Sequence, residues 1–296
     1  MRFFFNTLFA TVIISLYMIP SILLALAVII FGGLARLIPA KSGYRTLMKI
    51  ALYIAIMWTN VSNSILYFRR HQWKIEGEGN LNPRYWYLLI SNHQTWLDVL
   101  VLGYVFNQKT PLIKFFMKKE LLWELPILGL SCWILGYPFL HRRYQKDIRK
   151  RSTLTGKDIE TTKIICKQFK EFPTTIMNFV EGTRFTTEKH KRQQSPFLYL
   201  LKPKAGNIAV VINELQNELR GILNVTIHYS TPMSFWKYFS SNGANITIYY
   251  ELLPITADLI GNYYEDRKFR RYLQQWLNLI WKRKDLLLDK LNRGQT

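Results

Sequence analysis

The chain has 296 residues, enough for one sizeable core with an accessory segment. Lys and Arg number 40 against 19 Asp and Glu, so the net charge is +21, which indicates an anionic partner such as phosphorylated substrates, an acidic lipid surface or nucleic acid. Hydrophobic residues make up 49% and aromatic residues 15% of the chain, which excludes a disordered basic tail and is typical of a protein at a lipid interface.

The N-terminal segment is the most hydrophobic part of the sequence. No charged residue lies between Arg2 and Arg36, and the run 3–35 consists mostly of Leu, Ile, Val, Phe and Ala. About 20 apolar residues cross a bilayer as a helix, so this run is long enough, and it is too long for the apolar part of a cleavable signal peptide. Pro20 lies inside the run and is expected to kink or split the helix.

A second apolar stretch, over residues 47–68, is interrupted by polar residues, so an interfacial helix or the return arm of a helical hairpin is expected there. We therefore predict a hydrophobic helical membrane segment over residues 1–70, as one span or a hairpin, followed by a domain over residues 71–296. Basic residues follow the first run at Arg36, Lys41, Arg45, Lys49, Arg69 and Arg70. By the positive-inside tendency, residues 71–296 are expected to face the cytoplasm.

The two cysteines, Cys132 and Cys166, have a spacing that matches neither a metal site nor a redox pair. We expect buried, unreactive thiols, which agrees with a cytoplasm-facing domain. No other group of residues in the sequence predicts a metal site.

The pattern of residues 71–296 predicts alternating strands and helices. Strands are expected at 73–76, 85–91, 111–117, 137–141, 174–180, 222–229 and 245–253. Helices are expected at 95–106, in the first part of 121–140, at 156–171 and at 206–219. This alternation is typical of an α/β domain with a mixed, partly parallel sheet flanked by helices.

The tail over residues 263–291 has apolar residues at helical spacing, so we predict a C-terminal amphipathic helix. Its other face is expected to carry the basic residues Lys268, Arg271, Lys282 and Lys284. The apolar positions are Phe269, Leu273, Trp276, Leu277, Ile280 and Trp281. A helix packed on the domain explains this pattern, and adhesion to a membrane is the alternative.

A first motif follows the predicted strand 85–91, where Asn92 and His93 precede a helix that begins near Asp98. Sites in open α/β sheets form beyond the carboxyl ends of strands, so a His here can be open to a substrate. The Asp98 carboxylate would fix the imidazole tautomer and stabilise the imidazolium. Alternatively, Thr95 and Asp98 form a capping box that serves the helix alone.

A second motif, Glu181-Gly182-Thr183-Arg184, follows the predicted strand 174–180. Gly permits a tight turn with exposed amides, and the planar guanidinium of Arg184 suits phosphate oxygens. A Gly turn followed by Arg is common, so this motif alone favours a structural turn.

Two further basic clusters are candidates for binding an anion. The segment 136–142 ends in Arg142 and opens a basic run to residue 151, although a solvated or lipid-facing helix explains most of that run. Lys118 and Lys119 follow a predicted strand, where one of them can face an anion.

In this order, the motifs resemble those of the glycerolipid acyltransferase family typified by bacterial lysophosphatidic acid acyltransferase. The family's first block, N-H-x-x-x-x-D, is matched at Asn92, His93 and Asp98. Its second block, G-x-x-F-[IVL]-x-R, is matched at Gly136, Phe139, Leu140 and Arg142. Its third block, F-P-E-G-T-R, is matched at Phe179, Glu181, Gly182, Thr183 and Arg184. The stretches 115–121, 156–162 and 274–278 look closest to the YihG-like branch of inner-membrane acyltransferases. Val180 replaces the family Pro, and 224–227 lacks the Pro of a fourth block, which leaves the donor preference open.

The resemblance implies the glycerolipid acyltransferase fold and direct transfer of a fatty acyl group from acyl-CoA or acyl-carrier protein to 1-acylglycerol-3-phosphate, giving phosphatidic acid. In this mechanism His93 is the general base and Asp98 orients it, with no cofactor and no metal. The implied substrate-binding residues are Asn92, Lys118, Lys119, Arg142, Glu181, Gly182, Thr183 and Arg184. The implied location is the bacterial inner membrane, with the catalytic domain on the cytoplasmic side.

Three other functions are weighed against this one. The first is an acyltransferase for another lysophospholipid, such as lysophosphatidylglycerol or a lysocardiolipin, and the second is an inactive lipid-binding membrane protein. The third, nucleic-acid binding, lacks a zinc ligand set or an RNA-binding aromatic signature. A Ser-His hydrolase using Ser91 is disfavoured because the sequence has no G-x-S-x-G elbow. The oligomeric state is not predicted.

Overall fold

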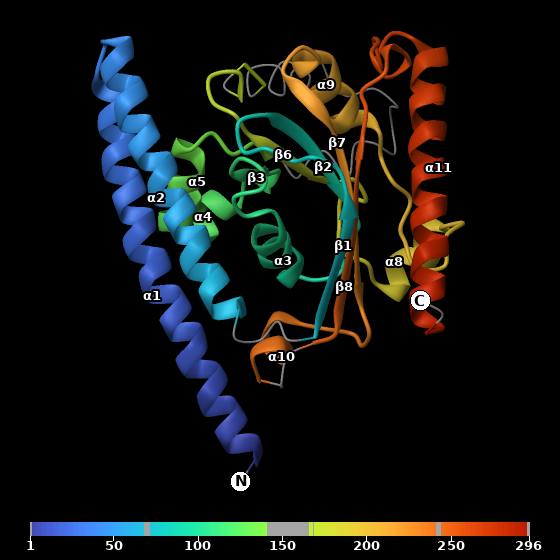
Figure 1. Cartoon of the computed structure of the whole chain (residues 1–296), viewed down its shortest axis with the longest axis horizontal. Coiled ribbons are helices and arrows are strands. Elements are labelled where there is room, and N and C mark those ends of the chain that lie inside the picture. Colours follow the sequence, from blue (N-terminus) through green and yellow to red (C-terminus); the bar gives the residue numbers. More distant parts are fainter. Residues whose placement is uncertain (1, 68–71, 141–165, 168, 241–243, 295–296) are drawn as a thin grey trace.

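The computed structural model describes residues 2–67, 72–140, 166–167, 169–240 and 244–294. Its centre is a six-stranded sheet in the order β1-β8-β7-β2-β6-β3 (Figure 1). The strands are β1 (Trp73–Glu78), β2 (Trp86–Ser91), β3 (Ile113–Phe115), β6 (Thr175–Phe179), β7 (Leu219–Tyr229) and β8 (Ile246–Leu253). Neighbouring strands in this sheet are parallel except for β7 and β8, which are antiparallel.

The expected mixed α/β architecture is confirmed, with differences at three places. The strand expected at 111–117 is divided into β3 and β4 (Met117–Lys118), and β4 pairs with β5 (Phe139–Leu140) in a separate small sheet. Two short helices, α8 (Thr187–Gln193) and α10 (Phe235–Ser240), were not predicted. Most of the helix expected over 156–171 lies outside the described residues. The other helices of the domain are α3 (Leu97–Phe106), α4 (Leu121–Glu124), α5 (Pro126–Ile134), α9 (Gly206–Leu215) and the final α11 (Arg267–Asn292).

The central strands are buried on both faces, which explains their nearly continuous apolar sequence. Successive side chains of a strand point to opposite faces. In β2, Leu88 and Ile90 join the core beneath α9 and α11, whereas Leu89 joins the core beneath α3. The polar side chains that end these strands therefore lie at the rim of a well-packed sheet.

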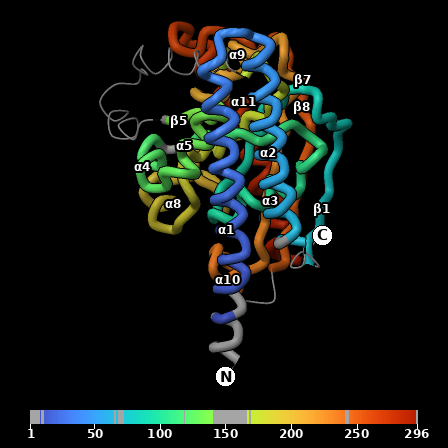
Figure 2. The backbone as a smooth tube through the Cα atoms, turned by 90° about the vertical axis from the view of Figure 1, so that its left-hand side faces the viewer, coloured from blue at the N-terminus to red at the C-terminus, as the bar shows by residue number. Residues whose placement is uncertain are grey.

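The N-terminal residues form a helical hairpin of α1 (Arg2–Leu37) and α2 (Lys41–Tyr67), which lie side by side along one flank of the domain (Figures 1 and 2). Pro20 lies inside α1 without dividing it. Small residues let the two backbones approach closely, since Ala25, Ala35, Ala51 and Ala55 are buried. By length and composition, the stretch Thr11–Leu37 is able to cross a membrane.

The C-terminal helix α11 lies on the opposite side of the sheet from the hairpin (Figure 1). Asp266 caps it by accepting hydrogen bonds from the backbone N–H groups of Lys268 and Phe269. The apolar face is buried at Leu273, Leu277, Ile280, Trp281 and Leu288, so the predicted packing on the domain is confirmed.

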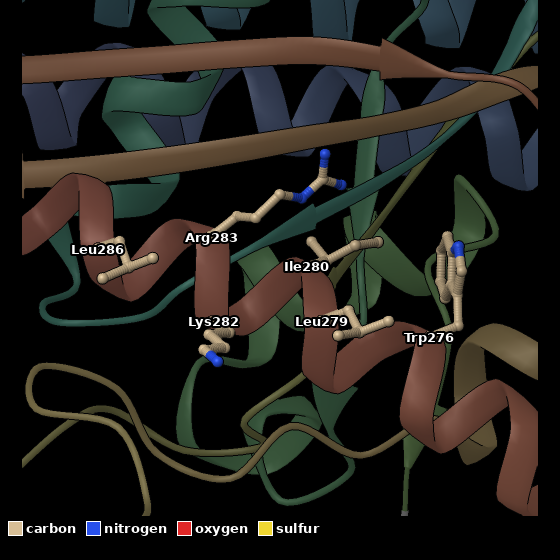
Figure 3. Close-up of a pocket in the computed structure, with 6 residues that line it drawn as sticks. All are labelled: Trp276, Leu279, Ile280, Lys282, Arg283 and Leu286. Atoms are coloured by element: carbon tan, nitrogen blue, oxygen red, sulfur yellow. The ribbon is translucent and has the colours of Figure 1, made fainter.

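The outer face of α11 carries exposed apolar side chains between cations. Leu279 and Leu286 are 64% and 56% exposed. Figure 3 shows Arg283 extending toward the strands while Lys282 points away from them. Contact of this outer face with a membrane stays a prediction.

Candidate active site

Loops from three neighbouring strands meet beyond the carboxyl ends of β2, β6 and β7. His93 follows β2, the turn 181–184 follows β6, and Tyr229 is the last residue of β7. Because these three strands are parallel neighbours, their ends lie at one edge of the sheet. The two predicted motifs are therefore brought to the same edge by the strand order.

His93 and Asp98 form a hydrogen-bonded pair. Nδ1 of His93 lies 2.8 Å from Oδ2 of Asp98, whose side chain is fully buried, whereas the His93 side chain is 13% exposed. An ionised carboxylate only accepts hydrogen bonds, so Nδ1 carries the proton and Nε2 is left able to accept one. This arrangement suits His93 to act as a base toward a hydroxyl group.

The Asp98 carboxylate is held by three further hydrogen bonds. Oδ2 accepts from the backbone N–H groups of Gln94, at 2.6 Å, and Thr95, at 3.0 Å. Oδ1 accepts from the hydroxyl of Tyr229, at 2.7 Å. Burial, and then the adjacent Asp98 charge, raise the pKa of Tyr229 well above its usual value, so this hydroxyl stays a donor. Asp98 thus binds the backbone at the helix start and His93 at the same time, so it does not serve the helix alone.

Asn92 joins β2 to β7 through its side chain. Its Nδ2 donates to the carbonyl of Ile227, and its Oδ1 accepts from the Ile227 N–H, each at 2.9 Å. The side chain of Asn92 is buried and engaged at both ends, which positions the loop before His93. Ser91 is also buried and donates to the Asn92 carbonyl, so its hydroxyl does not face a substrate.

The second motif forms a tight turn at the end of β6. Gly182 has a φ of +70° and donates its N–H to the Phe179 carbonyl at 2.8 Å, a conformation that favours glycine. Arg184 is exposed, and its guanidinium lies 5.1 Å from the centre of the Trp96 ring. Nζ of Lys189 donates to Oγ1 of Thr183, at 2.8 Å, and to the Arg184 carbonyl, at 2.9 Å.

The His93 loop and the turn contact each other directly. The Phe179 ring stacks on the His93 imidazole, with 3.7 Å between ring centres and 10° between planes. The N–H of Phe185 donates to the His93 carbonyl at 2.8 Å. The base and the cation-bearing turn are therefore parts of one site.

Glu181 lies beneath the turn, facing α11. Its side chain is buried, and burial raises its pKa well above the usual carboxyl value, although Trp281 and Lys284 oppose this shift. Lys284 is buried too, donates from Nζ to the Val225 carbonyl, and lies 4.9 Å from the centre of the Trp281 ring. Burial lowers the pKa of Lys284 from 10.5 to about 7.

Three further predicted residues, Lys118, Lys119 and Arg142, stay predictions as substrate-binding residues. Lys119 is exposed just before α4. The side chain of Lys118 and the whole of Arg142 lie outside the described part of the chain, so their roles stay predictions.

Sequence reasoning missed three residues of this region: Lys204, Tyr229 and Lys284. Tyr229 ends a predicted strand, but only the pairing of β7 with β2 brings it to Asp98. The expectation that Lys284 lies on the basic outer face of the tail helix is wrong, because its spacing puts it on the face of Leu277, Ile280 and Trp281, where it is buried.

An apolar cavity of about 490 Å³ lies between the hairpin and the domain. It is lined mainly by apolar side chains from α2, α3 and β3 and the segments around them, including Leu52, Ile56, Leu100, Gly103, Ile113 and Phe115. A cavity of this size and character is typical of a site for a small apolar ligand.

The two cysteines are free and buried, and burial raises the pKa of each thiol to about 12. The expected burial of both thiols is thus confirmed, and a raised pKa disfavours the reactive thiolate. Within the described residues, no three His, Cys, Asp or Glu side chains are grouped as metal ligands would be.

Residues 72–230, more than half of the chain, match the Acyltransferase family. The chain is 30% identical over 201 residues to 1-acyl-sn-glycerol-3-phosphate acyltransferase 3 of Arabidopsis thaliana, covering 60% of this chain and 50% of that protein. It is 28% identical over 124 residues to 1-acyl-sn-glycerol-3-phosphate acyltransferase alpha of Mus musculus, covering 42% and 37%. The chain therefore spans about half the length, or less, of these curated relatives.

A solved structure shows the same fold. The crystal structure of the 1-acyl-sn-glycerophosphate (LPA) acyltransferase PlsC from Thermotoga maritima aligns with a TM-score of 0.51 over 97% of each chain, at 15% identity. The expected fold class is thus confirmed over nearly the whole chain, including the hairpin. These relatives do not test the resemblance to the YihG-like branch, which stays a prediction.

Proposed function

Since the chain belongs to the acyltransferase family, we propose that it moves a fatty acyl group from an acyl thioester to the free hydroxyl of 1-acylglycerol-3-phosphate, giving phosphatidic acid. The observation that carries this proposal is the contact between the His93 loop and the turn 181–184. This contact puts a base beside a cationic turn. The acceptor has a hydroxyl group, which the base can deprotonate, and a phosphate, which the turn can bind.

In the proposed reaction, His93 takes the proton of the acceptor hydroxyl at Nε2 while the hydroxyl oxygen attacks the thioester carbonyl. Asp98 holds Nδ1–H and stabilises the imidazolium that forms. The C–S bond then breaks, and the thiolate leaves and takes up the proton from His93. General-base catalysis of this kind contributes roughly 10²- to 10⁴-fold to a rate.

Binding of the acceptor is assigned to the exposed part of the turn, formed by Gly182, Thr183 and Arg184. The guanidinium of Arg184 offers paired N–H donors that match phosphate oxygens. Asn92 and Glu181 support the site from beneath, because their side chains are buried and face Ile227 and α11. Lys118, Lys119 and Arg142 remain candidates for further phosphate contacts.

A fatty acyl chain fits the apolar cavity between the hairpin and α3. Its lining includes Val99 and Leu100, which directly follow Asp98 in the chain. A chain buried there loses its contact with water, which stabilises binding by about 0.8 kcal/mol for each CH₂ group. The proposed donor is acyl-CoA or acyl-carrier protein, and the thiolate is already a good leaving group, so the proposed reaction needs no cofactor.

The hairpin, within residues 1–70, is proposed to hold the domain of residues 71–296 at a bilayer. Its outer surface presents a row of exposed apolar side chains: Val12, Leu16, Ile19, Leu23, Leu26, Ile30, Leu34 and Leu37. A contiguous apolar surface of this kind marks a contact with lipid or protein. We place the protein in the bacterial inner membrane with the catalytic domain on the cytoplasmic side, where the basic residues after α1 would lie.

The proposal is tested with the purified full chain in detergent or vesicles, given labelled acyl-CoA or labelled acyl-carrier protein. The acceptors are 1-acylglycerol-3-phosphate, lysophosphatidylglycerol, a lysocardiolipin and a 1-acylglycerol without phosphate. We expect 1-acylglycerol-3-phosphate to give the highest kcat/KM. A higher kcat/KM for another lysolipid would show that this lysolipid is the preferred acceptor. Absence of transfer to every acceptor would refute the proposed acyltransferase activity.

A further inference from the structure

A lysine distant in sequence lies against the turn of the second motif. A Cβ atom added to Gly182 would lie 3.3 Å from Nζ of Lys204 and 3.9 Å from its Cδ and Cε. The end of the Lys204 side chain therefore runs along the turn, on the side where glycine leaves space. Lys204 itself belongs to the segment before α9, so this approach arises from folding and not from sequence proximity.

The backbone of Lys204 is fixed on both sides. Its N–H donates to the carbonyl of Val180 at 2.9 Å, which joins it to the residue before Glu181. Gln274 of α11 donates from Nε2 to the Pro203 carbonyl at 3.0 Å and accepts from the Ala205 N–H at 3.2 Å. The position of the lysine is thus set by two other elements before any ligand binds.

The Lys204 ammonium has no hydrogen bond and no ion pair with any residue that the structure describes. The Lys204 side chain is exposed, so a ligand can reach its ammonium, and the surrounding protein atoms lower the pKa of this group. Two other cations, Arg184 and Lys189, flank the same turn. Three positive groups on or against one turn favour an anion there.

We propose that Lys204 binds the phosphate of the acceptor, together with Thr183 and Arg184, on the face of the turn left open by Gly182. The inference rests on the proposed function, because the phosphate is that of the proposed acceptor. Lys204 supplies a point charge, and the Arg184 guanidinium supplies a planar fork of donors. The glycine is needed at this position both for its positive φ and because a side chain would meet Lys204.

The test compares Lys204→Met, which keeps the stem and removes the charge, with Lys204→Arg, which keeps the charge. Lys202→Met is the matched control, because Lys202 lies two positions earlier and is also exposed. Its backbone N–H donates to Gln193, and its side chain has no hydrogen bond to another residue that the structure describes. A hydrogen bond between charged groups corresponds to roughly a 10- to 100-fold change in binding. We expect Lys204→Met to raise KM for 1-acylglycerol-3-phosphate by that factor with a much smaller change in kcat.

Two comparisons separate phosphate binding from a structural role. With 1-acylglycerol, which lacks the phosphate, Lys204→Met and the native chain should have the same KM, and Lys204→Arg should recover most of the loss with the phosphorylated acceptor. Equal losses with both acceptors, or an unchanged KM with the phosphorylated one, would overturn the assignment.

A binding measurement keeps the inference independent of turnover. Binding of 1-acylglycerol-3-phosphate to the full chain in detergent is titrated for His93→Ala with and without Lys204→Met. Weaker binding in the double variant supports Lys204 even if the native chain transfers no acyl group, in which case only the proposed function fails. Equal binding by both variants, or no binding by either, would contradict the role of Lys204.

Discussion

Two buried polar regions support the candidate active site, and they differ in how completely they are hydrogen-bonded. In the first, both oxygens of Asp98 have partners: His93, two backbone N–H groups and Tyr229. In the second, beneath α11, Glu181 and Lys284 are buried within range of each other's charge but do not form an ion pair. Here Oε1 of Glu181, Oδ1 of Asn224 and Nε1 of Trp281 are buried without a hydrogen-bond partner.

This difference indicates that the first region fixes the geometry of the base, whereas the second region lowers the stability of the fold. A fully satisfied network fixes a single geometry, as a base that must meet a hydroxyl requires. A buried polar group without its full set of partners costs free energy of about 1–3 kcal/mol. The second region therefore lowers stability, because it buries polar atoms of Glu181 and Trp281 that lack hydrogen-bond partners. Three predictions sharpen this comparison, in order of decreasing effect.

The largest predicted effect is a dependence of folding stability on pH, caused by Lys284 in the second region. The pKa of Lys284 is lowered from 10.5 to about 7, so between these values the unfolded chain binds a proton that the folded chain does not. Stability should therefore rise with pH across this window, by on the order of 4 kcal/mol for this group. Lys284→Met should lose that rise, because Met does not titrate.

This effect is measured by denaturant unfolding of both proteins between pH 7 and 10. Lys282→Met is the matched control, since Lys282 is exposed on the same helix, and it should keep the native pH dependence. If native protein and Lys284→Met show parallel stability profiles, Lys284 is not buried as an uncharged amine.

The next effect concerns the turn between the two regions. Arg184→Ala should raise KM for 1-acylglycerol-3-phosphate by roughly 10- to 100-fold, because a charge-assisted hydrogen bond to the phosphate is lost. Steady-state kinetics measure it, and Arg192→Ala, an exposed arginine on α8, should match the native chain. An unchanged KM for Arg184→Ala would make Arg184 a structural residue of the turn.

A smaller effect is expected in the first region from Tyr229→Phe. The substitution keeps the ring and removes one hydrogen bond to Asp98, worth about 0.5–1.5 kcal/mol. We expect kcat to fall by roughly 2- to 15-fold with KM nearly unchanged, because Asp98 acts through His93. A native kcat in this variant would show that the backbone N–H groups alone hold Asp98.

Local sequence predicted the first region better than the second. His93 and Asp98 belong to one short stretch at a strand end, so the strand-to-helix pattern alone brings them together. Tyr229 comes from β7 and reaches Asp98 only through the strand order. Lys284 and Lys204 come from segments whose packing depends on the whole fold, and periodicity shows that α11 has an inner face without showing what that face covers.

The errors in the predicted secondary structure also arise where the structure depends on more than local sequence. The helix α8 has the sequence Thr-Glu-Lys-His-Lys-Arg-Gln, without apolar periodicity, and is started by the side chain of Thr186, which accepts from the Lys189 N–H. The stretch 111–117 was expected to be one strand, but it contributes to two sheets because Met117 and Lys118 pair with β5 and not with β6. Neither feature follows from local propensity.

The central claim is that His93 and Asp98 act as one unit in acyl transfer. The most direct measurement is the initial rate of transfer from labelled acyl-CoA or acyl-carrier protein to 1-acylglycerol-3-phosphate, for the native chain, His93→Ala, Asp98→Asn and the double variant. Each single variant should lose roughly 10²- to 10⁴-fold in rate, and the double variant no more than the worse single one, with membrane association unchanged. Normal turnover by His93→Ala would contradict the proposed mechanism.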